Sequence, residues 1–300
     1  MRICLSQFID APTEPEQVLS GVKAWGYDGL LVAAPHGVVD VGAANQWKAR
    51  SDELRRLAAD LGLAIAGIHA GRSVQPSFRR ASAAGELERV HGALQLAKSL
   101  GAGLVILTAP RLDDWRLRTH ALEQNAEALR RLAREALGLR VAIAFENGGD
   151  LLASTDAWFV ADSVGLPNLR ACLNVAAAVG AGESMSLALP RMGAMLAAVH
   201  LAVRPGDEAA PVAWEGVPEG KNEIARLVDV LKGMAFRGWL VVSPSPELDA
   251  AAQTRVATAA SAALRAELAK PVGELSAYKG DKHTPRFVAA SESGRSKAGQ

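Results

Sequence analysis

Residues 140–147 have the sequence RVAIAFEN, in which a nearly continuous apolar run ends directly at Glu146 and Asn147. Strands that are apolar almost throughout are typical of parallel sheets covered on both faces. A carboxylate that follows such a run without a linker emerges at the carboxyl edge of the sheet, where a surface residue would have little reason to lie. This stretch therefore predicts a buried parallel strand that ends in a functional or loop-organising carboxylate.

Seven further short apolar runs resemble it, and longer amphipathic stretches separate them. The eight expected strands are Arg2–Gln7, Gly29–Ala33, Leu63–His69, Gly103–Thr108, Arg140–Glu146, Leu169–Val175, Ala197–Val203 and Gly238–Val242. The expected helices are Glu14–Trp25, Ala49–Leu61, Gly85–Leu100, Trp115–Leu137, Thr155–Val164, Ser184–Met192, Asn222–Ala235 and Leu248–Leu268. Eight such alternating units predict an α/β fold, a (β/α)8 TIM barrel. An open doubly wound sheet would carry a glycine-rich phosphate turn after an early strand, and none follows.

The expected helix ends carry glycine where a left-handed residue is cheapest, at Gly62, Gly101 and Gly138. Apolar periodicity stops near Pro271. We therefore expect a single barrel domain over residues 1–270 and an irregular or disordered tail over residues 271–300.

The overall charge argues against polyanionic partners. Lysine and arginine total 33 against 32 acidic residues, a net charge of +1, so neither nucleic acid nor an anionic membrane is expected as a partner. We find no secretory leader and no apolar run of membrane-spanning length. Cys4 and Cys172 lie in strand-like runs and are expected to be buried free thiols. These features favour the cytoplasm.

Polar residues at the ends of barrel strands are the candidates for chemistry, because active sites of TIM barrels lie at that face. They are Gln7, His36, His69, Thr108, Glu146, Asn147, Asn174, His200 and Ser243. Glu146 is the most informative, although a salt bridge would also explain it. His200 could ligate a metal, hydrogen-bond a substrate hydroxyl, or be a satisfied interior histidine.

Several short motifs, in order and spacing, resemble the xylose isomerase-like family of sugar phosphate isomerases and epimerases. They are Phe145-Glu146-Asn147, Cys172-Leu173-Asn174, Val199-His200-Leu201, Pro218-Glu219-Gly220 and the run FRGWLVV at residues 236–242. The resemblance spans about residues 1–268. It implies a divalent cation (Mn, Mg or Zn) held by Glu, Asp, His and Glu from strands five to eight, and proton transfer between neighbouring carbons.

Only half of that ligand set is present. Glu146 and His200 match, whereas Asn174 stands for the aspartate and Ser243 for the last glutamate. A histidine that follows the family's aspartate is replaced by Ala177. Such a site is expected to bind a divalent cation weakly or not at all.

The resemblance implies roles for the remaining candidates. Glu146 would be the catalytic proton-transfer residue. Substrate contacts are expected from His36, His69, Asn147, Asn174 and Arg204. A rearranged metal site could use His36, His69, Glu146 and His200, but strands two and three are expected to lie across the mouth from strand seven.

Two classes of function therefore remain. One is a sugar isomerase or epimerase with an atypical site, acting on a small carbohydrate-like ligand. The alternative is a non-catalytic barrel that binds a carbohydrate or a protein partner. A zinc-dependent DNA endonuclease of the same superfamily would need more histidines and acids than this chain has. The sequence leaves open the sugar and whether the chain forms a homo-oligomer.

Overall fold

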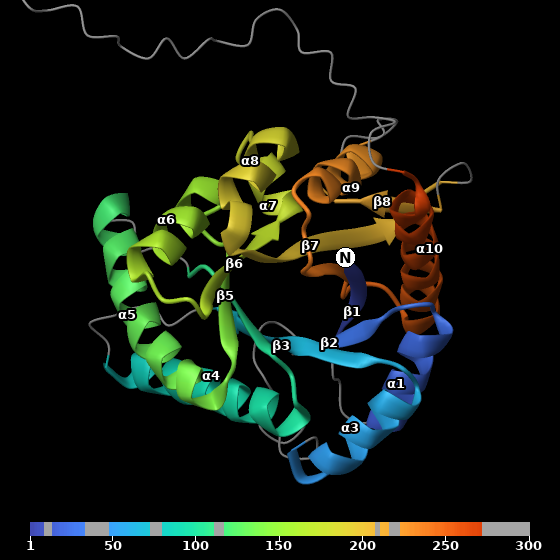
Figure 1. The fold of residues 1–300 in the computed structure, drawn as a ribbon, viewed down its shortest axis with the longest axis horizontal. Coiled ribbons are helices and arrows are strands. Elements are labelled where there is room, and N and C mark those ends of the chain that lie inside the picture. The colour runs from blue at the N-terminus through green and yellow to red at the C-terminus, as the bar shows by residue number, and fades with distance from the viewer. Residues whose placement is uncertain are drawn as a thin grey trace, which may run out of the picture.

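The computed structural model describes residues 1–8, 14–33, 48–72, 80–110, 117–207, 211–215 and 223–271. Within these segments, eight parallel strands form a closed barrel (Figure 1). Their order is β6-β5-β4-β3-β2-β1-β9-β7, and pairing between β6 and β7 closes the ring. The barrel strands are β1 (Arg2–Phe8), β2 (Gly29–Ala33), β3 (Ala64–Arg72), β4 (Leu104–Thr108), β5 (Ala142–Glu146), β6 (Leu169–Asn174), β7 (Leu196–Pro205) and β9 (Trp239–Pro244).

Helices surround the barrel on the outside (Figure 1). They are α1 (Pro15–Ala24), α3 (Ser51–Asp60), α4 (Arg80–Leu100), α5 (Arg118–Leu139), α6 (Ser154–Val164), α7 (Val175–Gly180), α8 (Met185–Met192), α9 (Glu223–Gly233) and α10 (Ala250–Ala269), with a short 3-10 turn at Gly193–Met195. Their apolar faces and the outward faces of the strands form one large hydrophobic layer. The predicted TIM barrel is confirmed.

Two short elements escape the sequence pattern. The strand β8 (Val212–Trp214) pairs antiparallel with the end of β7, and α7 is a six-residue helix directly after β6. Neither is long enough to display the periodicity on which sequence prediction depends. The predicted tail begins where the described residues end, so residues 272–300 lie outside them.

Helix ends follow the expected glycines at two of three places. Gly62 and Gly101 have positive φ angles of 65° and 68°. The expectation at Gly138 is wrong, because α5 continues to Leu139 and Arg140 takes the left-handed conformation, with φ at 60°. There the amide of Val141 bonds to the carbonyl of Ala136, which closes the helix immediately before β5 begins. The start of β5 therefore decides which residue takes the left-handed conformation. The nearby Gly138 does not shift that position.

The start of α6 also differs from the expectation. The helix begins at Ser154, one residue before the predicted Thr155, and no side chain at its N-cap closes it. Instead the Glu183 carboxylate accepts from the Ser154 amide at 2.6 Å and from its hydroxyl at 3.0 Å. A carboxylate from a distant segment thus satisfies donors that a local cap residue usually takes.

The barrel interior is a separate apolar cluster of mostly small side chains. It contains Cys4, Leu31, Ala66, Leu104, Ile106, Ala144, Cys172, Ala198, Trp239 and Val241. Trp239 fills the amino-terminal end of the barrel, and the Arg2 guanidinium lies 3.9 Å from the centre of its ring. Both cysteines are free and buried, as predicted. In the part of the chain that the structure describes, no helix is long and apolar enough to span a bilayer.

Candidate functional site

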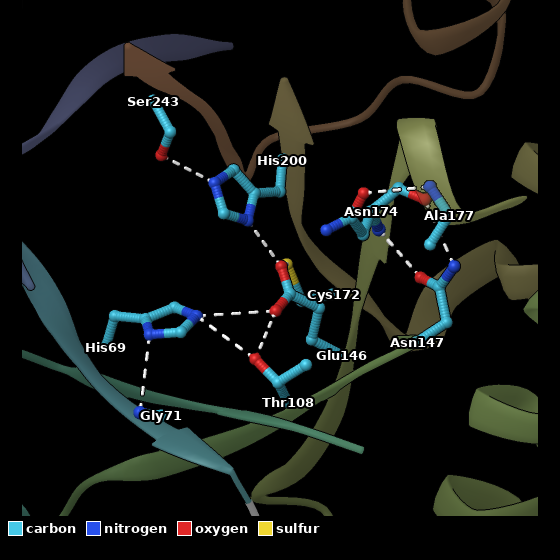
Figure 2. A network of polar contacts seen from close by, with 10 residues as sticks. All are labelled: His69, Gly71, Thr108, Glu146, Asn147, Cys172, Asn174, Ala177, His200 and Ser243. Carbon is cyan, nitrogen blue, oxygen red and sulfur yellow. Dashed lines mark hydrogen bonds and ion pairs between the residues drawn. The ribbon is translucent and has the colours of Figure 1, made fainter. Parts of the chain in front are cut away.

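Glu146 is the last residue of β5 and is only 1% exposed. Its carboxylate lies at the carboxyl end of the barrel among donors from three other strands (Figure 2). Thr108 of β4 donates its hydroxyl to Oε2 at 2.6 Å, and His200 Nδ1 of β7 lies 2.5 Å from Oε1. His69 Nε2 of β3 lies 3.3 Å from Oε2. The buried charge is therefore compensated from both sides.

The orientation of His69 comes from an irregularity in β3. The register between β3 and β4 shifts after His69, and Gly71 has a φ of 72°, which favours glycine. This kink directs the Gly71 amide to His69 Nδ1 at 3.3 Å. Since Nδ1 accepts, the proton of the neutral ring lies on Nε2, the atom that faces Glu146 and the Thr108 hydroxyl.

His200 connects Glu146 to a second strand end. It stands in β7 opposite Val241 of β9, and its Nε2 lies 2.5 Å from the hydroxyl oxygen of Ser243. The nitrogen that faces a carboxylate carries a proton, so Nδ1 donates to Glu146. In the neutral ring Nε2 then accepts from the Ser243 hydroxyl, and in the protonated ring it donates to the same oxygen.

The charges of this pair support one another. Burial alone would raise the pKa of Glu146, but the neighbouring His200 and His69 outweigh it and hold that pKa well below its usual range. Burial lowers the pKa of His200, but the Glu146 charge and hydrogen bond outweigh that effect and raise it. Glu146 therefore stays ionised, and His200 holds its proton to a higher pH than usual.

Beneath them lies the Cys172 thiol, 3.8 Å from Glu146 Oε1. Burial, followed by the adjacent Glu146 charge, raises the pKa of this thiol well above its usual value. Cys172 is thus a neutral donor to the carboxylate rather than a reactive thiolate.

The two asparagines near Glu146 have structural contacts: the Asn147 side chain joins two strand ends, and the Asn174 side chain caps a helix. Asn147 is fully buried, and its amide donates to the carbonyls of Leu152 at 2.7 Å and Asn174 at 3.1 Å, while its oxygen accepts from the Asn174 amide at 2.7 Å. The Asn174 side-chain oxygen in turn caps α7 by accepting from the Ala177 amide at 3.1 Å. Asn147 thus holds β5 against β6, and its expected substrate contact stays a prediction.

Two candidates for substrate contact, Arg204 and His36, remain. Arg204 is exposed on the outer part of β7, where it pairs with Ala213 of β8. His36 lies outside the described residues. Thr108 was predicted only as a strand-end polar residue, and its bond to Glu146 had no sequence signal beyond that position. No sequence signal indicated the contacts of Gly71 and Cys172.

The four-ligand cation site that the resemblance implies does not fit these residues. The oxygen of Asn174 is directed to the end of α7, and the Ser243 hydroxyl is paired with His200. Both replacements also remove a negative charge that a hard divalent cation would need. We therefore assign no chemical step to a metal here.

A different set of three ligand atoms does converge. In the described part of the chain, His69, Glu146 and His200 place their donor atoms within 4.8 Å of one another. The expected separation of strands three and seven does not keep the two histidines apart, since their ring centroids are 5.9 Å apart. Both rings point inward to the same carboxylate (Figure 2), which shortens the distance across the mouth. Two imidazoles and one carboxylate suit a transition metal better than magnesium.

Comparison with known proteins establishes the family. A model of the xylose isomerase-like TIM barrel matches residues 19–265, so the chain belongs to this family. No curated protein sequence matches it.

Solved structures with the same fold include several sugar epimerases. A D-psicose 3-epimerase from Clostridium cellulolyticum H10 is 16% identical with a TM-score of 0.68, covering 89% of this chain and 99% of its own. An L-ribulose 3-epimerase is 18% identical with a TM-score of 0.68, covering 89% and 94% respectively. A probable 3-DHS dehydratase from Bacillus anthracis is 14% identical with a TM-score of 0.66, covering 88% and 99%. At these identities the likeness shows the fold alone.

Proposed function

We propose that this protein is a cytoplasmic isomerase or epimerase that moves a proton within a small carbohydrate-like substrate. The observation that carries the proposal is the centre formed by Glu146 between His69 and His200 at the carboxyl end of the barrel. Isomerisation of a hydroxy-carbonyl compound needs a group that removes a proton from carbon and another that supplies one to oxygen. Two imidazoles joined through one carboxylate provide such a pair.

The exposure of these groups assigns their parts. The side chains of His69 and His200 are 15% and 14% exposed, whereas that of Glu146 is 2% exposed. A substrate in the mouth would therefore meet the imidazoles first. Glu146 orients both rings, and in this proposal its negative charge stabilises the proton on His200 during the transfer. The site differs from the family's usual one in that two metal ligands are replaced by Asn174 and Ser243.

The substrate class is proposed by analogy with the structural relatives. These relatives include ketose epimerases, such as those for D-psicose and L-ribulose. Fold likeness does not transfer activity by itself, so the supporting argument is the acid-base centre at the same end of the barrel. Ketoses of five or six carbons are the first substrates to test.

Deuterium exchange tests the proposal without knowledge of the product. The protein is incubated in D2O with individual ketoses and ketose phosphates, and NMR follows exchange at the carbons beside the carbonyl. We expect exchange with at least one compound, and a loss of about 100-fold or more in Glu146→Gln. An exposed control, Glu135→Gln, should exchange at the wild-type rate.

The same preparation is used to test whether the protein binds a metal ion. Elemental analysis for Mn, Zn, Mg and Fe compares the wild type with a Glu146→Gln, His200→Ala double variant. If no compound exchanges, with or without added millimolar Mn²⁺, the proposal is wrong. Saturable binding of a ketose without exchange would instead support the alternative, a non-catalytic carbohydrate-binding barrel.

A further inference from the structure

Glu146, His200 and Ser243 form a continuous chain of polar contacts across three strands. The carboxylate lies 2.5 Å from His200 Nδ1, and His200 Nε2 lies 2.5 Å from the Ser243 hydroxyl oxygen (Figure 2). A nucleophilic serine is activated when its hydroxyl lies within hydrogen-bond reach of one imidazole nitrogen and a carboxylate holds the other nitrogen of the same ring. This arrangement is recognised by geometry and does not depend on fold or sequence order.

We propose that Ser243 is a nucleophilic serine, activated by His200 and Glu146, which accepts the acyl group of small carboxylic esters. This activity is separate from the isomerisation proposed above and does not rest on it.

Glu146 and Ser243 are also held in place by contacts outside the series Glu146–His200–Ser243. Glu146 is fixed from its other side by Thr108 at 2.6 Å and by His69 at 3.3 Å. Ser243 belongs to β9 and pairs with Ala202 of β7, so a strand rather than a loop supports it. Ser243 is also partly exposed, so it is not sealed in the core as Cys4 and Cys172 are. A nucleophile must be both held and accessible, and this residue is both.

The chemistry balances without a cofactor. The Ser243 oxygen forms a bond to the ester carbonyl carbon while its proton passes to His200 Nε2. The ester C–O bond breaks, and the same proton leaves with the departing alcohol. Water then attacks the acyl carbon and gives a proton to His200. The bond between the acyl carbon and the Ser243 oxygen breaks, and His200 passes that proton to the Ser243 oxygen. The acid is released, so that ester and water become acid and alcohol.

The residue after Ser243 limits which substrates are expected. Many serine hydrolases stabilise the developing oxyanion with the amide of the residue that follows the nucleophile. Here that residue is Pro244, which has no N–H. We therefore expect reaction with activated esters and phosphonates, whose leaving groups depart readily, and not with amides.

A fluorophosphonate probe tests the nucleophile directly. Attack by the Ser243 oxygen forms an O–P bond and breaks the P–F bond, with the proton passing through His200 to give HF. We expect one adduct by intact mass, mapped to Ser243 by peptide sequencing. Ser243→Ala should abolish it, and His200→Gln should slow it by about 100-fold or more. The matched control Ser245→Ala, two residues further along, should react like the wild type.

A thiol variant provides a second readout if the alanine variant proves poorly folded. In Ser243→Cys, His200 should activate the new thiol towards iodoacetamide, whereas the native Cys4 and Cys172 are 0% exposed and act as internal controls. We expect alkylation at position 243 alone, and at least a 10-fold slower rate in Ser243→Cys, His200→Gln. Circular dichroism confirms that each variant is folded.

Three results would overturn the proposal: no phosphonate adduct, an adduct on another residue, or alkylation at position 243 that is independent of His200. Loss of ketose exchange in the earlier experiment would leave these measurements unaffected, so the two proposals fail separately.

Discussion

The two ends of the barrel are built from the same eight strands but held together by opposite means. At the carboxyl end, polar side chains such as Thr108, Glu146 and His200 are joined by short hydrogen bonds. At the amino end, Trp239 fills the barrel and backbones approach closely, so that a side chain on Gly238 would lie 2.1 Å from the Ala197 carbonyl oxygen. The carboxyl end depends on hydrogen bonds between polar side chains. The amino end depends on glycine, whose missing side chain allows the backbones to pack closely.

The largest expected effect comes from breaking the polar pairing. Glu146→Ala leaves the largely buried His200 without its carboxylate and removes the acceptor of Thr108. We expect a loss of about 3–5 kcal/mol in the free energy of unfolding, measured by urea denaturation. The exposed Glu135→Ala in α5 should leave the midpoint nearly unchanged. A loss below about 1 kcal/mol in Glu146→Ala would mean that the carboxylate contributes little to stability.

The second prediction restores the family's two missing carboxylate ligands at the carboxyl end of the barrel. Asn174→Asp combined with Ser243→Glu puts carboxylates at the two positions where the family's aspartate and last glutamate would stand. Because charge count governs affinity for hard cations, Mn²⁺ binding should tighten by on the order of 100-fold relative to the wild type. Isothermal titration calorimetry measures the change. Equal affinity in the two proteins would show that these two positions do not limit cation binding.

At the amino end, an added side chain should destabilise the barrel by steric clash. In Gly238→Ala the added carbon meets the backbone of Ala197 and the ring of Phe236, neither of which is the flexible tip of a side chain. We expect a loss of about 1–3 kcal/mol in unfolding free energy.

Gly92→Ala in α4 is the matched control for that change. Nothing lies within 4 Å of the added carbon there, and alanine favours a helix over glycine. This variant should therefore gain about 0.5–1 kcal/mol. The same sign of change in both variants would contradict the crowding argument.

The smallest effect is a pH dependence confined to the polar end. The lowered pKa of Glu146 contributes stability above the ordinary carboxyl pKa of about 4.3, and this is lost as pH falls further. The raised pKa of His200 contributes stability below the ordinary imidazole pKa of about 6.5, lost as pH rises through its folded value. The difference in Tm between the wild type and His200→Gln should therefore be largest between those two values.

Thermal unfolding from pH 4 to 9 measures that difference, with Gly238→Ala as the comparison. The Gly238 variant changes no titratable group, so its Tm deficit should stay constant across the same range. A constant deficit in His200→Gln as well would show that the ion pair does not contribute.

The sequence predicted the strands well because each is a local apolar run whose length and spacing need no distant partner. It missed β8 and α7, since three and six residues are too few to show a period. It placed His69, Glu146, His200 and Ser243 at one end of the barrel, but gave Ser243 no role beyond standing at the position of a missing metal ligand. The contact between Ser243 and His200 joins residues 43 positions apart, and no local pattern records it.

The sequence by itself therefore determined the (β/α)8 architecture, the family and the end of the barrel at which chemistry is expected. Only the tertiary structure decided which polar groups meet. It turned Asn174 into a helix cap and joined Glu146, His200 and Ser243 in one chain of contacts. The physical reason is that strand formation follows local periodicity, whereas side-chain pairing at the mouth depends on barrel closure and on register between strands that are distant in the sequence.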